Sequence, residues 1–346
     1  MIIQLIRSNL RNFQAYSSAR SLYNKGMLLD ANENSFGSVI KSADDLSLNR
    51  YPDPYSLDLR KALAKFLRMS EKNIFVGNGS DEAIDLLIRL FVEPDEEIVV
   101  IEPTYGMYKV AAELAGVAVR TCTVDENFQT DIAALLSNVT AKTKIIFCCS
   151  PNNPTGVLMK LQDIERLCKN FSGVVVVDEA YIEFASKPSA VRKVLNLPNL
   201  VVLRTFSKAW GLAGIRVGYA VAQPEIIEYL NRIKPPYNLN RLSGKLAIEA
   251  LAKYPKMMEF RGAILEERKK LVKDLSAVGF KVFPSEANFL LVSYPQASKV
   301  AQVLAEKYGI IIRDFGTKPK LKDCVRISVG TPKQNKLLIQ ALKKII

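Results

Sequence analysis

The 346-residue sequence contains no histidine, although it has 48 lysines and arginines and 35 acidic residues. Histidine is the usual general base near neutral pH and a frequent zinc ligand. Its absence therefore excludes Ser-His-Asp and Cys-His hydrolases and the common zinc sites. We expect no metal site, and any proton transfer has to use a lysine, a carboxylate, a tyrosine or a bound cofactor.

Paired cysteines and long apolar runs are also missing. The five cysteines are odd in number and form no CxxC pair, so we expect small buried side chains in a reducing cytoplasm. No run reaches the roughly 18–20 apolar residues that span a bilayer, which predicts no membrane contact. Arg7 and Arg11 interrupt the apolar residues of the first segment, a pattern that is not typical of a signal peptide.

The net charge of +13 raises the question of a nucleic-acid partner. The basic residues are scattered and mixed with acids, and the densest stretch, EERKKLVKDL at 266–275, alternates in sign as a solvated helix face does. We therefore expect a charged surface that attracts small anionic substrates rather than nucleic acid.

The middle of the sequence predicts an α/β fold. Helical patterns at 80–92 and 161–171 lie between short apolar runs rich in β-branched residues. Such runs are typical of a mainly parallel sheet sandwiched by helices. The predicted strands lie at residues 97–101, 143–150, 173–180, 199–205 and 217–222.

The last third has a different pattern and predicts a smaller α+β domain. Long helices are expected at about 242–278, 297–307 and 332–345, with short strands around FKVFPS, NFLLVSY, GIIIRDF and CVRISVG. Two prolines in IKPPYNLN (233–240) favour a boundary there. We predict a large cofactor-binding domain at 40–235, and a second unit made of an N-terminal segment, 1–39, and the small domain, 236–346.

Unusual residues gather where predicted strands end, which is where open α/β sheets bind ligands. FVGNGSDEAI ends a short strand in glycines and opens a helix at Ser80 and Asp81. Backbone N–H groups at such a helix start can bind phosphate, although an ordinary capping box explains the same residues.

Asp178 ends the apolar strand of VVVVDEAY, where an ionised carboxylate is costly unless it is paired with a cation. Lys208, after the next strand, is one candidate cation, and a protonated ring nitrogen of a cofactor is another. Lys208 follows Ser207 and precedes small residues in SKAWGLAGIRVGY, which indicates a pocket rather than a helix face. SPNNPTG (150–156) on its own predicts only a tight turn.

Together these motifs resemble the fold-type I aminotransferases that use pyridoxal 5′-phosphate (PLP). SPNNPTG, DEAY, SKAWGLAGIRVGY and RISVG occur in the order and spacing of that family. The resemblance implies that Lys208 forms the imine with PLP and serves as general base, and that Asp178 holds the proton on the ring nitrogen. It also implies that Asn153 and Tyr181 bind the phenolic oxygen and that Tyr105 stacks on the ring.

The resemblance further implies a phosphate site and a homodimer with shared active sites. Tyr51, in NRYPDP, matches a tyrosine that reaches the phosphate from the partner subunit. The other expected phosphate ligands are the backbone N–H groups of Ser80 and Asp81, together with Ser207 and Arg216.

Longer stretches, including LRNFQAYSSARSL, LDANENSFG and PTYGMY, resemble the histidinol-phosphate aminotransferases. That group exchanges the amino group of L-histidinol phosphate with 2-oxoglutarate in histidine biosynthesis. The resemblance implies that Arg326 and Arg313 bind the substrate anions, that Tyr16 lies near the substrate phosphate, and that Asn32 lies where the N-terminal segment closes over the site. Both arginines can also be read as edge charges of the small domain.

Three alternatives stay open at this point. One is threonine-phosphate decarboxylase, a related PLP enzyme whose substrate also carries phosphate, and another is a broad or aromatic amino-acid aminotransferase. The third is a basic nucleic-acid-binding protein on an inactive aminotransferase fold. The presence of Lys208, Asp178 and Arg216 argues against the third.

Overall fold

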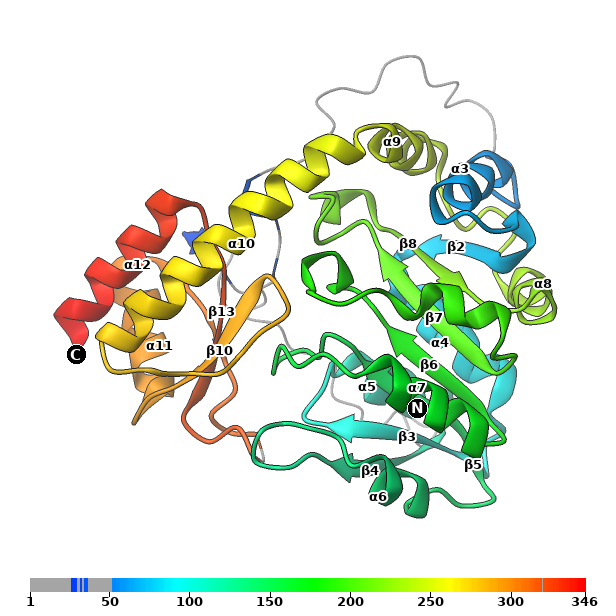
Figure 1. The fold of residues 1–346 in the computed structure, drawn as a ribbon, viewed down its shortest axis with the longest axis horizontal. Helices are drawn as coiled ribbons and strands as arrows, with labels where there is room; N and C mark the ends of the chain where they lie inside the picture. The colour runs from blue at the N-terminus through cyan, green and yellow to red at the C-terminus, as the bar shows by residue number, and fades with distance from the viewer. Residues whose placement is uncertain (1–25, 30–31, 33, 37–51, 319) are drawn as a thin grey trace, which may run out of the picture.

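The computed structural model describes residues 26–29, 32, 34–36, 52–318 and 320–346. Its centre is a seven-stranded sheet with strand order β2-β8-β7-β6-β5-β3-β4 (Figure 1). The strands are β2 Ile74–Asn78, β3 Glu97–Glu102, β4 Ala118–Thr123, β5 Thr143–Cys149, β6 Val174–Asp178, β7 Leu200–Thr205 and β8 Val217–Val221. The predicted α/β fold with a mainly parallel sheet is therefore confirmed.

One strand runs against the others. The pairs β3–β4, β3–β5, β5–β6 and β6–β7 are parallel, whereas β8 pairs antiparallel with both β7 and β2. The carboxyl ends of β5, β6 and β7 consequently lie side by side at one edge of the sheet. The residues that follow these three strands are thereby brought together.

Both faces of the sheet are buried, which explains why its strands are continuously apolar. In β6, Val175 and Val177 belong to one hydrophobic cluster, while Val174 and Val176 belong to the other. Helices cover the sheet on either side. They are α3 Leu57–Leu67, α4 Gly79–Phe91, α5 Met107–Ala115, α6 Ile132–Ser137, α7 Leu161–Asn170, α8 Pro224–Ile233 and α9 Arg241–Ala252.

A smaller α+β unit follows, as predicted. Its four-stranded sheet has the order β12-β13-β10-β9 and is antiparallel throughout. Figure 1 shows the long helix α10 running from beside α9 to this sheet. The elements are α10 Tyr254–Ala277, β9 Lys281–Val282, β10 Phe289–Ser293, α11 Ala297–Tyr308, β12 Arg313–Asp314, β13 Cys324–Ser328 and α12 Pro332–Ile345. The predicted limits of the two domains, 40–235 against 1–39 and 236–346, stay a prediction.

Two details differ from the sequence prediction. The helix expected over 242–278 is two helices, α9 and α10, separated at Lys253. The reason is Pro255, which a helix tolerates only in its first turn. The strand expected in GIIIRDF is also divided, because β11 (Ile310–Ile311) leaves the small sheet and pairs in parallel with β1 (Met27–Leu28).

Four short 3₁₀ helices complete the described chain: η2 Glu71–Asn73, η3 Ile182–Phe184, η4 Ala190–Leu195 and η5 Ala213–Ile215. Among the described residues, none of the helices has the length and apolar character needed to cross a membrane.

Candidate active site

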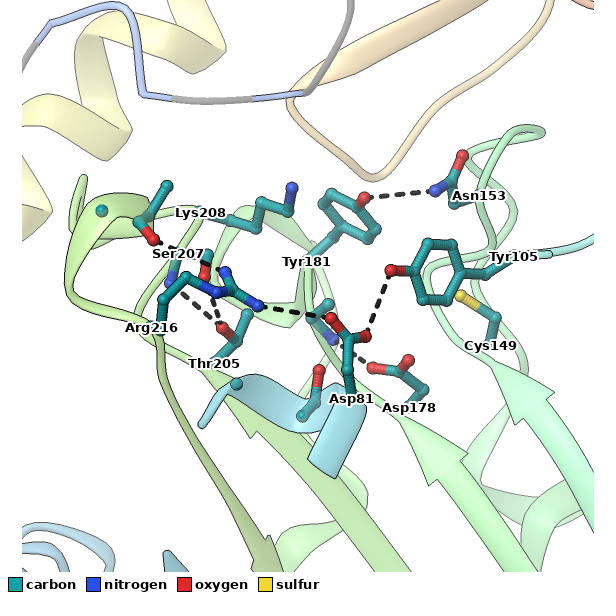
Figure 2. A pocket seen from close by; sticks show the side chains of 15 residues that line it. Asp81, Tyr105, Cys149, Asn153, Asp178, Tyr181, Thr205, Ser207, Lys208 and Arg216 are labelled. Carbon is teal, nitrogen blue, oxygen red and sulfur yellow. Dashed lines mark hydrogen bonds and ion pairs between the residues drawn. The ribbon is translucent and has the colours of Figure 1, made fainter. Parts of the chain in front are cut away.

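A cavity of about 330 Å³ opens at the carboxyl ends of β5, β6 and β7. Its volume lies within the range of about 300–1,000 Å³ that is usual for small-molecule sites. Figure 2 shows side chains from several loops pointing into it. It is lined by Gly79, Ser80, Asp81, Tyr105, Cys149, Asn153, Asp178, Ala180, Tyr181, Thr205, Ser207, Lys208, Ala213, Gly214 and Arg216. Nine of the predicted site residues thus surround one cavity.

Asp178 lies at the last position of β6 and is 3% exposed. Its Oδ2 accepts a hydrogen bond of 2.8 Å from the hydroxyl of Tyr108, and its Oδ1 accepts one of 3.1 Å from the backbone N–H of Ala180. Burial raises the pKa of this carboxyl to about 6, and the bond from Tyr108 partly offsets the shift. The site therefore holds a carboxylate whose two protein donors are neutral.

Tyr181 and Asn153 lie above Asp178 and are joined, as Figure 2 shows. The amide nitrogen of Asn153 donates to the hydroxyl of Tyr181 at 3.3 Å, and that of Asn32 donates to the same oxygen at 3.2 Å. Both acceptor positions of this hydroxyl are filled, so its own hydrogen is available to another acceptor. Burial raises the pKa of Tyr181, which keeps the hydroxyl protonated.

Lys208 follows β7 in a tight turn that is closed by a 3.1 Å hydrogen bond from Gly211 N–H to the lysine carbonyl. Its Nζ lies 5.7 Å from the ring centroid of Tyr181. Two residues earlier, Phe206 is fully buried and fixes the turn. An amine held in this way can form an imine with an aldehyde.

The start of α4 forms the opposite wall of the cavity. Gly79, with φ +77°, leads into the helix, and a Cβ atom here would lie 2.7 Å from Nη2 of Arg216. At Gly218 a Cβ atom would collide with the backbone nitrogen of Ser80, so β8 approaches the helix start only because this residue is glycine. Backbone N–H groups and a guanidinium are thus brought to the same place, which suits an anion such as phosphate.

The helix is capped differently from the sequence expectation. Its N-cap is Asn78 rather than Ser80, and the carboxylate of Glu82 accepts the backbone N–H of Asn78 at 2.5 Å. No capping box forms at this helix start, because the side chain of Asn78 makes no cap hydrogen bond. Because Glu82 turns back toward Asn78, it leaves the N–H groups of the first turn to the cavity.

Asp81 has a second role that the sequence did not indicate. Its carboxylate accepts a 3.1 Å hydrogen bond from the hydroxyl of Tyr105 and forms a 3.3 Å ion pair with Arg216 (Figure 2). Tyr105 also meets the ring of Tyr108 edge-on, at 5.6 Å between centroids. The expectation that Tyr105 stacks on a cofactor ring stays a prediction.

Ser207 lines the cavity together with Thr205, which the sequence analysis missed. The hydroxyl of Thr205 donates to that of Ser207 at 2.9 Å and accepts the backbone N–H of Ser207 at 3.1 Å. Tyr108 was also missed, although it lies three residues after Tyr105 in PTYGMY. This spacing, close to one turn of helix, was the available signal.

The two expected substrate arginines lie on neighbouring strands, where Arg313 of β12 is paired in register with Arg326 of β13. Arg326 is 6% exposed, lies over the rings of Phe289 and Phe315, and donates a hydrogen bond to Oδ1 of Asn153. It is therefore a buried residue connected to the cavity wall rather than an edge charge.

Arg313 is only half-buried, and its guanidinium lies 5.6 Å from the ring centroid of Phe315. Neither arginine lines the 330 Å³ cavity itself.

Asn32 is buried at 1% exposure, with φ +54°. Its backbone N–H donates to Ser328 Oγ at 3.0 Å, and its Oδ1 accepts the Ser328 hydroxyl at 2.8 Å. This pairing directs its amide nitrogen to Tyr181, so the structure brings Asn32 to the site through a side-chain contact. Tyr16 and Tyr51 lie outside the described residues.

Comparison with known proteins agrees with this geometry. Residues 24–342 match the family model for aminotransferase class I and II. Two curated histidinol-phosphate aminotransferases are each 45% identical to this chain. The match to the Parabacteroides distasonis protein covers 99% of this chain and 98% of the relative. The match to the Cytophaga hutchinsonii protein covers 98% of this chain and 97% of the relative. The predicted resemblance is confirmed.

Among solved structures, histidinol-phosphate aminotransferase from Sinorhizobium meliloti in complex with pyridoxal 5′-phosphate superposes with a TM-score of 0.90. The two chains are 25% identical, and the match covers 99% of this chain and 98% of that one. The structure from Clostridium acetobutylicum is 30% identical with a TM-score of 0.80, over 86% of this chain and 91% of that one. The chain therefore belongs to the aminotransferase class I and II family.

Proposed function

We propose that this protein transfers the amino group of L-histidinol phosphate to 2-oxoglutarate with PLP as cofactor, yielding imidazole acetol phosphate and glutamate in histidine biosynthesis. The observation that carries the proposal is the convergence in one cavity of an amine, Lys208, a buried carboxylate, Asp178, and a guanidinium at a helix start, Arg216. Sequence identity of 45% to histidinol-phosphate aminotransferases over nearly the whole length supports the substrate.

The residues present fit PLP in three respects. A buried carboxylate with only neutral protein donors suits a protonated ring nitrogen, because an uncompensated buried charge is costly. The helix start cleared by Gly79 and Gly218 and completed by Arg216 suits the phosphate. The available hydrogen of Tyr181 suits an anionic ring oxygen.

When bound, PLP supplies an electron sink for the substrate carbon that loses its proton. The protein has to hold and move that proton, and Nζ of Lys208 is the basic atom available for it in a chain without histidine. Asp178 would keep the ring nitrogen protonated, and Tyr181 and Asn153 would hold the ring oxygen. Lys208 consequently acts both as the anchor and as the base.

Substrate recognition is assigned to the arginines and to the N-terminal segment. Both substrates are anions, and a guanidinium suits carboxylate and phosphate equally well. We assign the distal anion to Arg326 and Arg313, with Tyr16 near the substrate phosphate and Asn32 as part of the segment that closes the site. The contact of Arg326 with Asn153 supports its place beside the cofactor.

We also propose a homodimer in which Tyr51 of each subunit reaches the phosphate of the other. A groove of about 450 Å³ lies between residues 52–59 and 239–248. Tyr55, Leu57 and Leu242 on these two segments are exposed apolar side chains, which supports burial against a second copy.

The proposed location is the reducing cytoplasm. All five cysteines are described, and all are buried as free thiols, with no disulfide between them. Burial raises the pKa of each thiol, which keeps the thiols protonated and weakly reactive.

Replacing the proposed anchor is the direct test. Lys208→Ala should abolish glutamate formation from histidinol phosphate and 2-oxoglutarate, and should remove the visible absorption of bound PLP that borohydride reduces. Lys142→Ala, at an exposed lysine, is the matched control and should keep full activity. Full transamination by the Lys208 variant would refute the proposal.

The products distinguish the related enzymes. Glutamate formation supports the aminotransferase, whereas release of carbon dioxide from threonine phosphate would identify the decarboxylase. A higher kcat/KM for aromatic amino acids than for histidinol phosphate would identify the broad aminotransferase.

A further inference from the structure

Tyr108 is a fully buried tyrosine behind the wall of the proposed active site, and its hydroxyl is bonded to Asp178. It lies in the first turn of α5 with 0% of its surface exposed. Its hydroxyl donates to Oδ2 of Asp178 at 2.8 Å. Asp178 lines the cavity, whereas Tyr108 is not among the described cavity-lining residues. Tyr108 therefore acts on a bound molecule through neighbours in the cavity wall, and Asp178 is the one that accepts its hydrogen bond.

Packing fixes the direction of this hydroxyl. The ring of Tyr108 is stacked on Phe147 of β5, with 4.8 Å between centroids and 11° between planes. Tyr105 meets the same ring edge-on at 84°. Aromatic contacts on two sides hold the ring in one orientation, so the hydroxyl is already aimed at Asp178 before any ligand arrives.

The hydrogen-bond pattern of Asp178 shows what Tyr108 contributes. An ionised carboxylate has about four acceptor positions. Tyr108 fills one on Oδ2 and the backbone N–H of Ala180 fills one on Oδ1. The pKa of Tyr108 is raised well above its usual value, chiefly by burial, so the tyrosine remains the donor in this bond.

The charges around Asp178 make this donor important. Burial raises its pKa to about 6, and the negative charge of Asp81 adds to the shift. The bonds from Tyr108 and Ala180 and the charge of Lys208 act in the opposite direction. Two further titratable neighbours among the described residues, Cys149 and Tyr181, stay neutral because burial raises the pKa of each. Without the hydroxyl of Tyr108, the balance moves toward a neutral carboxyl.

We propose that Tyr108 is a positioning residue for the transamination, holding the Asp178 carboxylate ionised and oriented so that the ring nitrogen of bound PLP keeps its proton. This inference rests on the proposed function. It adds to the site a residue that contacts neither cofactor nor substrate.

Tyr108→Phe tests the role, because it removes the hydroxyl and keeps the packed ring. The direct measurement is the ¹⁵N chemical shift of ring-labelled PLP bound to the full-length protein. In the wild type we expect the signal of a protonated nitrogen, and in the variant a shift toward the unprotonated value. We also expect a loss of PLP affinity on the order of tenfold and a similar fall in kcat, with KM little changed.

Three control variants separate this role from packing. Phe147→Leu removes the stacked ring but keeps the hydroxyl, and Tyr219→Phe removes the hydroxyl of another buried tyrosine, on β8. Tyr219→Phe should leave the ¹⁵N signal at its wild-type value, and Phe147→Leu, which loosens the ring but keeps the hydrogen-bond donor, should move it less than Tyr108→Phe does. Asp178→Asn sets the upper limit, since it removes the carboxylate itself. If Tyr108→Phe does not fold, 3-fluorotyrosine at position 108 keeps the shape and changes the acidity of the hydroxyl, and the signal should still move.

An unchanged ¹⁵N signal in the Tyr108 variant, with a clear shift in Asp178→Asn, would overturn the inference and leave the proposed function intact. A wild-type protein that takes up no PLP would instead refute the proposed function. A shift of equal size in Phe147→Leu would assign the effect to packing and also overturn the inference.

Discussion

Asp178 and Glu179 are neighbours in the sequence and are almost equally buried, yet their carboxylates have different partners. Glu179 faces the core, where it accepts hydrogen bonds from Ser189 and from the backbone N–H of Ala190 and forms a 3.3 Å ion pair with Arg204. Asp178 faces the cavity and receives only neutral donors from the protein. Burial raises the pKa of both carboxyls, to about 6 for Asp178.

This difference in partners shows that one residue of the DEAY motif serves the structure and its neighbour serves the site. The charge of Glu179 is compensated by the protein itself, so this side of the segment is complete on folding. The charge of Asp178 lacks such a cation at contact distance among the described residues, and its site suits one that arrives with a ligand. DEAY therefore contributes one residue to the core and one to the cavity.

The largest effect is expected on the core side. Arg204 is buried and also bonds Glu183 at 2.6 Å, so Arg204→Met leaves two buried carboxylates without their cation. We expect the free energy of unfolding to fall by about 3–5 kcal/mol, with or without cofactor. Thermal melting of both forms measures this, and a loss confined to the cofactor-bound form would show that Arg204 does not belong to the core side.

In the cofactor-free protein, Asp178→Asn should raise the free energy of unfolding, whereas Arg204→Met lowers it. Asp178 has a folded-state pKa of about 6 against an ordinary 3.8, so the folded protein holds this proton more tightly than the unfolded chain. The contribution of the Asp178 carboxyl to the free energy of unfolding is fully present below about pH 4 and is lost as the pH rises to about 6. This loss amounts to about 3 kcal/mol at most. The variant should therefore gain stability over wild type between pH 4 and 6 and stay ahead above it.

Melting curves from pH 4 to 8 measure that gain. Glu179→Gln is the matched control on the core side: the pKa of Glu179 is raised as well, so its pH profile should have the same sign, whereas its activity with PLP should stay close to that of the wild type. With PLP present the Asp178 variant should lose activity on the order of 100-fold or more. Equal losses of activity in the two variants would contradict the comparison.

Tyr181→Phe is expected to have a smaller effect on stability. It removes the acceptor shared by the amide nitrogens of Asn32 and Asn153, which should cost about 1–2 kcal/mol. A double-mutant cycle with Asn32→Ala measures the coupling, and the two losses should be less than additive. Additive losses would show that the hydrogen bond between Asn32 and Tyr181 contributes nothing to the stability of the cavity wall.

Much of this arrangement could be predicted from the sequence, for a physical reason. The carboxyl ends of parallel strands lie at one edge of a sheet. Residues that end or follow apolar runs, such as Asp178 and Lys208, can therefore be predicted to lie close together even when no long-range contact is known. Arg204 in the run LVVLRT carried a further signal. A cation in a buried strand requires acids, and Glu179 and Glu183 were available.

The contacts that were missed depend on how separate elements pack. The bond between Tyr108 and Asp178 needs α5 to start at Met107 and to place the Tyr108 ring on Phe147 of β5, and neither is encoded within PTYGMY. The link of Asn32 to Ser328 joins residues 296 positions apart. The division between α9 and α10 was readable from Pro255, since proline belongs in a first turn.

The smallest effect is expected at Ser189, on the core side. Its Oγ caps η4 by accepting the backbone N–H of Val191 at 2.9 Å, and its hydroxyl donates to Glu179. Ser189→Ala should lower the free energy of unfolding by about 1 kcal/mol, because a cap and a donor to a paired carboxylate are both lost. Ser137→Ala, at an exposed serine of α6, should change it by less than about 0.5 kcal/mol. The ¹⁵N signal of bound PLP should stay at its wild-type value in the Ser189 variant, since Glu179 and not Asp178 loses a donor. A shifted signal would mean that the two sides of the segment are coupled.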